Sequence, residues 1–157
     1  MISIGVTNKN HIPTLREICE NVAEISYVTK NKDVSKFDIV VISEKSKIQI
    51  CNTISQDSFL IINSDIISPL DISCNQRVYI ITFGLNSKAT LTASSLEGNH
   101  IFLCLQRTVI DINNNEIEPQ EFLINNNNEY DIDQLMSIVA TSIVCGLPIK
   151  KLSSFVF

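Results

Sequence analysis

The sequence lacks an excess of positive charge. Its twelve Lys and Arg residues are outnumbered by seventeen Asp and Glu residues, which leaves a formal net charge of −5. Nucleic-acid phosphates attract basic surfaces, so this composition disfavours nonspecific nucleic-acid binding. Long apolar runs are also missing, because stretches such as residues 59–62 fall far short of the roughly twenty residues that cross a bilayer. No basic segment precedes an apolar one near the N-terminus, so we expect neither a membrane span nor an export signal.

Closely spaced metal-binding or redox residues are absent as well. The cysteines form no C-x-x-C pair, which argues against a zinc knuckle or a thiol redox motif. The two histidines, His11 and His100, have no partner at the spacing of a triad or a metal site, so we predict structural or surface roles and no metal. In a reducing compartment a free cysteine behaves as a small hydrophobe. We therefore predict a cytoplasmic protein with five reduced, mostly buried cysteines: Cys19, Cys51, Cys74, Cys104 and Cys145.

What the sequence contains is enough apolar material for one core. Of its 157 residues, 45% are hydrophobic and 18% are charged, a length and composition typical of one ordinary domain. No linker, repeat or second domain is visible, and we predict a single domain over residues 1–157.

The first half reads as alternating strands and helices. We predict strands at residues 2–6, 25–29, 37–43, 59–63 and 78–83. Three-to-four-residue apolar spacing predicts helices at 11–24, where Pro13 suits the first turn, and at 47–55. Continuous apolar runs at residues 37–42 and 59–62 are typical of parallel strands covered on both faces. The predicted sheet core is Ile4, Ile39, Val41, Leu60, Ile62, Ile80 and Phe83.

The second half has a different pattern. Residues 89–95, 100–110 and 116–124 are β-rich pieces separated by turn residues, which suggests antiparallel hairpins. Asp131 and Gln134 have the spacing of a capping box for a helix that stops at Gly146 and Pro148. A last helix at 148–155 would bury Leu152 and Phe155. The predicted fold class is α/β: a mostly parallel, Rossmann-like sheet flanked by helices, with antiparallel hairpins in the second half and a C-terminal helical pair.

The order of these pieces resembles the central, ATP-binding domain of the Mur ligase family, the peptidoglycan amino-acid ligases and their folylpolyglutamate synthetase relatives. Residues 59–65, FLIINSD, look like the family strand that ends in Asn-x-Asp-Asp, and residues 80–84, IITFG, look like the next strand. The hairpins and closing helices, including Cys-Gly-Leu-Pro-Ile at 145–149, follow in the family's order. The resemblance covers roughly residues 58–157 and implies the same fold.

The N-terminal half departs from the family's phosphate loop. The family has T-G-T-N-G-K-T-T after its first strand, whose N–H groups and lysine cradle ATP phosphates. Here residues 4–14 read IGVTNKNHIPT, so the second glycine of this motif is absent. Lys9 is not followed by Ser or Thr, so the magnesium-binding hydroxyl is missing too. We interpret Lys9 as a solvated turn lysine.

Further family residues for ATP and magnesium are missing. The Thr-Asn-x-x-x-Asp-His-Leu-Asp segment is deleted between Ser43 and Lys45, and the closing helix lacks His-Asn-x-x-Asn. Lys47 stands where the family has a carbamylated lysine, but no carboxylate–histidine set accompanies it, and we interpret it as a solvated helix lysine. The family's substrate-binding and closing domains are also not expected on this chain.

We therefore predict a noncatalytic Mur-ligase-like domain that acts through binding or assembly, with no catalytic residues and no cofactor, ATP and magnesium being disfavoured. One alternative is a small-ligand or nucleotide module; another is a subunit of an ATP-dependent amide ligase of cell-wall biosynthesis. In an open α/β sheet the ligand crevice lies at the carboxyl ends of the strands. We also expect a protein partner or self-association, because one hairpin face would expose Leu103, Leu105 and Val109. The candidate rim residues are Thr7, Asn8, Lys9, Asn63 and Asp65.

Overall fold

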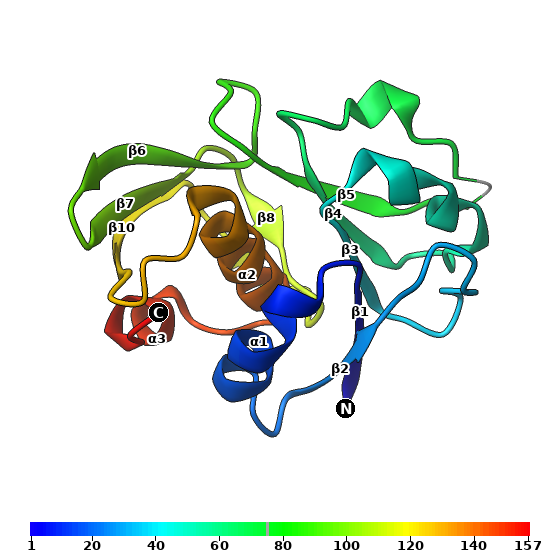
Figure 1. Ribbon diagram of the computed structural model, residues 1–157, viewed down its shortest axis with the longest axis horizontal. Helices are drawn as coiled ribbons and strands as arrows, with labels where there is room; N and C mark the ends of the chain where they lie inside the picture. The colour runs from blue at the N-terminus through cyan, green and yellow to red at the C-terminus, as the bar shows by residue number, and fades with distance from the viewer. Residues whose placement is uncertain (75) are drawn as a thin grey trace.

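A computed structural model describes residues 1–74 and 76–157. Its main feature is an eight-stranded sheet in the order β10-β7-β6-β5-β4-β3-β1-β2 (Figure 1). The α/β fold class predicted from the sequence is confirmed. The sheet contains β1 (Ile2–Val6), β2 (Ala23–Tyr27), β3 (Ile39–Ile42), β4 (Phe59–Asn63), β5 (Tyr79–Phe83), β6 (Leu91–Glu97), β7 (His100–Leu105) and β10 (Gln120–Asn125).

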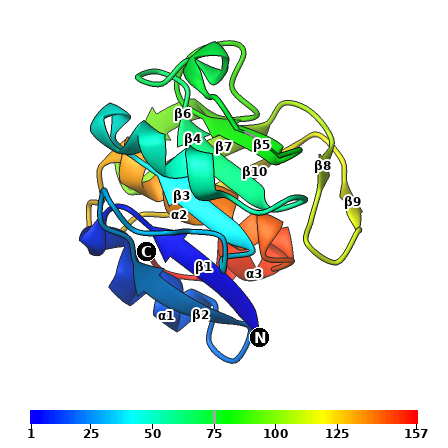
Figure 2. The same cartoon turned by 90° about the vertical axis from the view of Figure 1, so that its right-hand side faces the viewer.

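The first five strands are parallel and largely buried between two layers. On one face, α1 (Ile12–Ile18) and α2 (Ile132–Val144) cover the sheet; on the other face lies the 3₁₀ helix η2 (Lys45–Thr53) (Figures 1 and 2). Every residue of β3 and β4 is buried. Their side chains alternate between two cores, with Val41 in the α2 core and Val40 in the η2 core. This two-sided burial is the physical reason for their continuous apolar sequences.

The last strands form the antiparallel extension expected from the sequence. The strand β7 pairs with β6 on one side and β10 on the other, while β8 (Val109–Ile110) and β9 (Glu116–Ile117) form a separate two-stranded sheet. The prediction that Leu103, Leu105 and Val109 are exposed is wrong, since each is at most 2% exposed. They point into the core under α2, and the alternate residue Phe102 faces outward.

Two predicted helices differ from the observed ones. The first helix ends at Ile18 instead of continuing to residue 24, because Asn21 adopts a left-handed φ of 64° and the chain turns into β2 there. The Val22 N–H donates to the Cys19 carbonyl in this turn. The helix predicted at 47–55 is instead the 3₁₀ helix η2, two residues earlier, and it buries Ile50 and Cys51.

The closing helices occur where the sequence places them, but their ends differ. Asp131 is the N-cap residue of α2, yet its side chain makes no capping hydrogen bond, so the predicted capping box is wrong. The Gln134 amide instead donates to the Asn10 carbonyl, 3.1 Å away. In α3 (Ile149–Ser154) Leu152 is buried as predicted, whereas Phe155 is only half-buried and Phe157 is fully buried.

Most of the predicted core is confirmed, with one exception. Ile4, Ile39, Val41 and Phe83 are buried, as are Leu60 and Ile62, but Ile80 is 37% exposed. It lies on the η2 face of β5, beyond the part of the sheet that η2 covers. All five cysteines are free, and three of them are buried. In the described part of the chain, no helix is long and apolar enough to cross a membrane.

Candidate functional site

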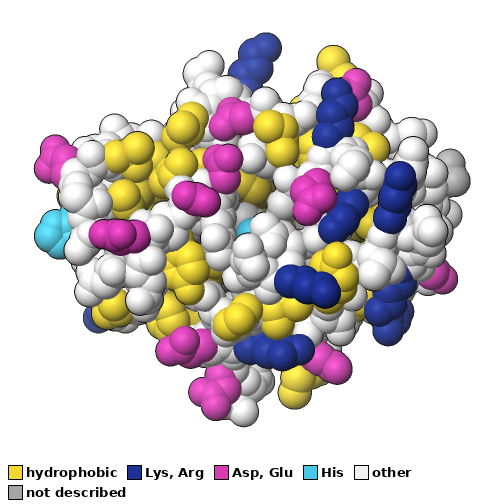
Figure 3. All heavy atoms as spheres, viewed as in Figure 1, with side chains coloured by type: hydrophobic (Ala, Val, Ile, Leu, Met, Phe, Trp, Pro, Cys, Tyr) yellow, Lys and Arg dark blue, Asp and Glu magenta, His cyan; other side chains and the backbone are white. Residues whose placement is uncertain are grey.

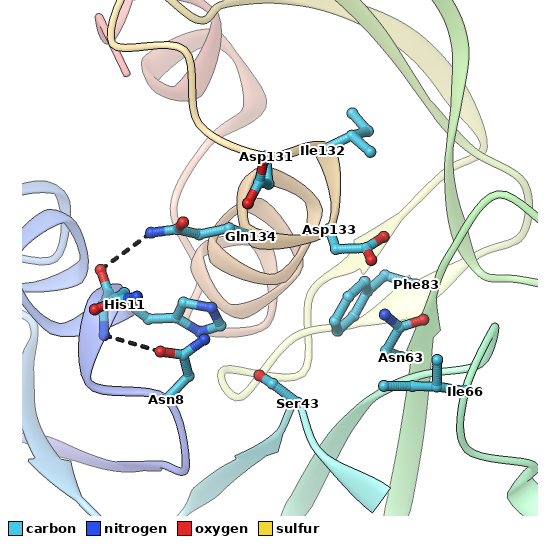
Figure 4. Close-up of a pocket in the computed structure, with 11 residues that line it drawn as sticks. Asn8, His11, Ser43, Asn63, Ile66, Phe83, Asp131, Ile132, Asp133 and Gln134 are labelled. Carbon is cyan, nitrogen blue, oxygen red and sulfur yellow. Dashed lines mark hydrogen bonds between the residues drawn. The ribbon is translucent and has the colours of Figure 1, made fainter.

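A polar cavity of about 440 Å³ lies at the carboxyl ends of the central parallel strands (Figure 4). Its floor comes from the ends of β3, β4 and β5, and its walls from the turn after β1 and the first turn of α2. This is the position at which open α/β sheets bind ligands. The lining residues are Asn8, Asn10, His11, Ser43, Asn63, Ile66, Phe83, Asp131, Ile132, Asp133 and Gln134.

The turn after β1 is closed by its own hydrogen bonds. Thr7 is buried; its hydroxyl donates to the Val41 carbonyl at 3.2 Å and accepts from the Ser43 N–H at 3.1 Å. The Asn8 side chain accepts the Asn10 N–H at 3.0 Å and so caps the short 3₁₀ turn η1 (Lys9–His11), which runs into α1 (Figure 4). One of the N–H groups that a phosphate loop would offer to an anion is therefore used inside the chain.

Lys47 is bound into the same turn, so its interpretation as a solvated lysine is wrong. Its Nζ donates to the Thr7 carbonyl at 2.7 Å and lies 3.6 Å from the Glu44 carboxylate, with 15% of the side chain exposed. Lys9 is exposed, and its Nζ lies 4.8 Å from the centre of the Tyr27 ring, outside the cavity lining. Lys47 Nζ lies 5.3 Å from the same ring, so Tyr27 stands beside both cations.

Asn63 and Asp65, predicted together, have different roles. Asn63 is 3% exposed, lines the cavity, and accepts the Asp65 N–H on its Oδ1. Asp65 turns away from this cavity and accepts the N–H groups of Leu85 (2.7 Å) and Asn86 (3.1 Å). Desolvation raises the pKa of the Asp65 carboxyl, but the hydrogen bonds from Asn86 and Leu85 together outweigh it and leave the pKa below its usual value. Asp65 therefore ties the ends of β4 and β5 together.

His11 is the most buried titratable group of the cavity. It is 2% exposed, and its Nδ1 lies 3.4 Å from the Ser137 hydroxyl on α2. Burial lowers the pKa of His11 from 6.5 to about 4, because the charged imidazolium loses its hydration. At neutral pH the imidazole is uncharged and offers one donor and one acceptor nitrogen.

The cavity wall opposite the turn is acidic. Asp131 and Asp133 begin α2, and Figure 4 shows the Asp133 carboxylate across from Asn63 and Ser43. No Lys or Arg is among the described residues that line the cavity. In the space-filling view, acidic side chains gather over the α2 end of this face, while most Lys and Arg lie over the β1–β5 side (Figure 3). The described residues contain no group of three His, Cys, Asp or Glu that could hold a metal ion.

Of the predicted rim residues, the structure brings Asn8 and Asn63 together in the cavity lining; Thr7, Lys9 and Asp65 lie outside it. Sequence reasoning missed His11, Ser43, Asp131 and Asp133. The signal for His11 was its place directly after a strand-ending turn, at the edge where ligands bind. Asp131 was assigned to helix capping, which explained the residue without requiring it to face a cavity.

Solved structures of similar fold include Mur ligases. MurF from Acinetobacter baumannii matches with a TM-score of 0.57 and 8% identity, covering 97% of this chain and 44% of that one. The murein peptide ligase Mpl from Psychrobacter arcticus matches with a TM-score of 0.64 and 9% identity, and the match covers 98% of this chain and 46% of that one. MurF ligase from Thermotoga maritima in complex with ADP matches with a TM-score of 0.61 and 12% identity, and the match covers 98% of this chain and 48% of that one. The chain has a Mur-ligase-like fold.

This likeness lies in the fold alone, because sequence identity is 12% or less in the three structures. The chain spans less than half the length of each of them. No family model matches the sequence, and no curated protein matches it either.

Proposed function

We propose that this Mur-ligase-like domain is noncatalytic and acts by binding, with a degenerate phosphate loop in the turn after β1. The observation that carries this proposal is that Lys47, a cation beside the turn, donates to the Thr7 carbonyl at 2.7 Å. A lysine that binds phosphate must direct its ammonium at the ligand, and here the ammonium is bound to the protein.

The backbone of the turn supports the same proposal. Its Asn10 N–H is occupied by the Asn8 side chain, and Asn8 stands where the phosphate loop has the glycine that precedes its lysine and allows close approach to the ligand. Phosphoryl transfer depends almost wholly on positioning and on stabilisation of negative charge. In this turn the Asn10 and His11 N–H groups are already bonded within the chain, and the ammonium of Lys47 is bound to Thr7, so less of both is provided.

The charge of the cavity is a third argument. Its lining holds the Asp131 and Asp133 side chains and no cation among the described residues, and the histidine is neutral near pH 7. A triphosphate in this cavity would meet like charge from the exposed Asp131 and Asp133 carboxylates and no compensating cation among the described lining residues.

A small-ligand or nucleotide module remains the second candidate, favoured by the position of the cavity at the carboxyl ends of the parallel strands. A third candidate is the ATP-dependent ligase subunit. Calorimetric titration with ATP and magnesium, combined with a phosphate-release assay, separates the three. Neither heat nor turnover supports the noncatalytic proposal, heat without turnover supports a nucleotide module, and magnesium-dependent turnover supports the ligase subunit.

We further propose that the domain works in the cytoplasm with a protein partner, of which a second copy is the simplest. The free state of all five cysteines supports a reducing compartment. Leu103, Leu105 and Val109 are buried, so the apolar side chains that the sheet offers to a partner are instead Ile80 and Phe102, which are 37% and 36% exposed. Sedimentation velocity over a wide concentration range tests self-association: a sedimentation coefficient that rises with concentration supports it, and a constant monomer value contradicts it.

A further inference from the structure

The cavity presents two polar groups, from Ser43 and Asn63, that have no partner among the described residues. The hydroxyl oxygen of Ser43 is inaccessible to solvent and makes no hydrogen bond within the described residues. The Asn63 side chain, 3% exposed, uses Oδ1 for the Asp65 N–H and no described residue accepts from its Nδ2. Figure 4 shows both side chains directed from the strand ends toward the cavity. Buried polar atoms are normally paired, so unpaired ones at a cavity indicate a ligand.

The acidic wall defines the charge of that ligand. The Asp131 side chain makes no capping bond, although it stands at the N-cap position where such a bond is usual. Asp133 lies one residue inside the helix on the same cavity wall. With a neutral histidine opposite, the lining favours a cation over an anion.

The volume and the apolar lining of the cavity define the size and the apolar part of the ligand. A volume of about 440 Å³ falls within the usual range of small-molecule sites. Ile66, Phe83 and Ile132 supply apolar surface between the polar groups. A short carbon chain that carries an ammonium group fits both features.

We propose that the cavity binds a small organic cation, a short aliphatic chain that carries one or two ammonium groups. The ammonium donates to the Asp131 and Asp133 carboxylates. The Asn63 Nδ2 donates to a polar group along the rest of the molecule, and the Ser43 hydroxyl reaches the ligand by rotating about χ1, since its oxygen is shielded from solvent in this structure. This proposal deepens the proposed binding function and rests on it.

The test uses three probes of equal chain length and different charge. Calorimetric titration near pH 7.5 compares 1,4-diaminobutane, 1,4-butanediol and succinate with the unmodified protein. We expect saturable binding of the diamine, weaker binding of the diol and none of succinate. Equal binding of all three, binding of succinate alone, or no saturable binding of the diamine would overturn the proposal.

Charge-neutral variants separate the site from the overall negative charge. The double variant Asp131→Asn, Asp133→Asn should weaken diamine binding roughly tenfold or more, since it removes charge-assisted hydrogen bonds. The control, Glu20→Gln with Glu24→Gln, removes the same charge from exposed positions outside the cavity and should leave binding unchanged. An equal loss in both variants means general attraction to an acidic protein and contradicts the proposal.

Ser43→Ala distinguishes a binding role of Ser43 from a structural role, because the two roles predict different changes in ligand affinity and in the unfolding midpoint. Removing an unpaired buried hydroxyl should leave the unfolding midpoint unchanged or raised, while any probe that bonds to the hydroxyl binds more weakly. We expect 4-amino-1-butanol, which carries one hydroxyl, to lose affinity in this variant and 1,4-diaminobutane to lose less. Equal affinities of the variant and the unmodified protein for the amino alcohol would remove Ser43 from the site.

The failure of this inference is distinguishable from that of the proposed function. If neither the diamine nor ATP with magnesium binds, the cation site is wrong and the noncatalytic proposal stands. If ATP with magnesium binds and turns over, the noncatalytic proposal is wrong whatever the diamine does.

Discussion

The parallel and antiparallel halves of the sheet bury their residues in different ways. In the parallel half, β3 and β4 are buried on both faces, between α2 and η2. In the antiparallel half, β7 alternates, with Leu103 buried under α2 and Phe102 exposed. The difference shows that coverage on one or two faces decides whether burial along a strand is continuous or alternating, since residues 101–105 of β7 are all apolar in sequence and are still buried alternately. The cavity lies between the halves, where β5 ends and α2 begins.

Leu60→Ala should have the largest effect of the variants that test this comparison. Leu60 is fully buried, and we expect a loss of about 2–5 kcal/mol in the free energy of unfolding. Its register partner on β5, Ile80, is 37% exposed, and Ile80→Ala should cost clearly less. Urea denaturation of both variants provides the measurement. Equal losses would mean that both strands are covered on the η2 side.

His11→Gln should change how stability depends on pH. The pKa of His11 falls from 6.5 in the unfolded chain to about 4 in the fold, so the unfolded chain binds the extra proton between these values. The stability present above pH 6.5 is therefore lost as the pH falls toward 4, by roughly 3 kcal/mol from this group. His11 shares its cavity with Asp131 and Asp133, whose carboxylates the His11→Gln variant retains.

Urea denaturation between pH 7 and pH 4 should show a shallower loss of stability in His11→Gln than in the unmodified protein. The control is His100→Gln, which changes the exposed histidine of β7. If the His11 and His100 variants have the same pH dependence, His11 does not titrate as a buried group.

Gly84→Ala tests the connection between the two halves. A Cβ at Gly84 would lie 2.7 Å from the Asp65 Oδ1, and the residue has a φ of 156°. We expect a loss of about 1–3 kcal/mol in the free energy of unfolding, because the Asp65 carboxylate, which holds the Leu85 and Asn86 N–H groups after β5, must shift. Gly98 at the β6–β7 turn has a φ of 61° with nothing near a Cβ, so Gly98→Ala should cost about 1 kcal/mol from backbone strain alone. If thermal unfolding shows that Gly98→Ala is less stable than Gly84→Ala, the contact between Gly84 and Asp65 does not contribute as described.

Phe102→Thr should have the smallest effect. The side chain is 36% exposed on the uncovered face of β7, and threonine favours strands. We expect the free energy of unfolding to change by less than about 1 kcal/mol. A loss as large as that of Leu60→Ala, measured in the same urea series, would show that this face is covered.

The fold was predictable from the sequence because its signals are local. The run at residues 59–63 gave β4 with its observed bounds, and Gly146 marked the end of α2. Ile80 was misjudged because apolarity alone does not reveal how far η2 reaches over β5. Leu103 was assigned to the wrong face because residues 101–105 are all apolar, and which of them face the core depends on the long-range pairing of the strand.

The candidate site was less predictable because it is formed by long-range packing. Asn8 and Asn63 were found because turns after parallel strands share one edge of the sheet. The position of Asp133 depends on the packing of α2, which follows in sequence after the whole antiparallel half. The bond from Lys47 to Thr7 spans 40 residues and has no sequence signature.

The most direct test of the noncatalytic proposal is phosphate release from ATP in the presence of magnesium. The bonds that close the turn predict a background rate, with no difference between the unmodified protein and Lys9→Ala, whose side chain is exposed and should not affect folding. Magnesium-dependent turnover that is lost in Lys9→Ala or Lys47→Ala, with both variants folded by circular dichroism, would contradict the proposal.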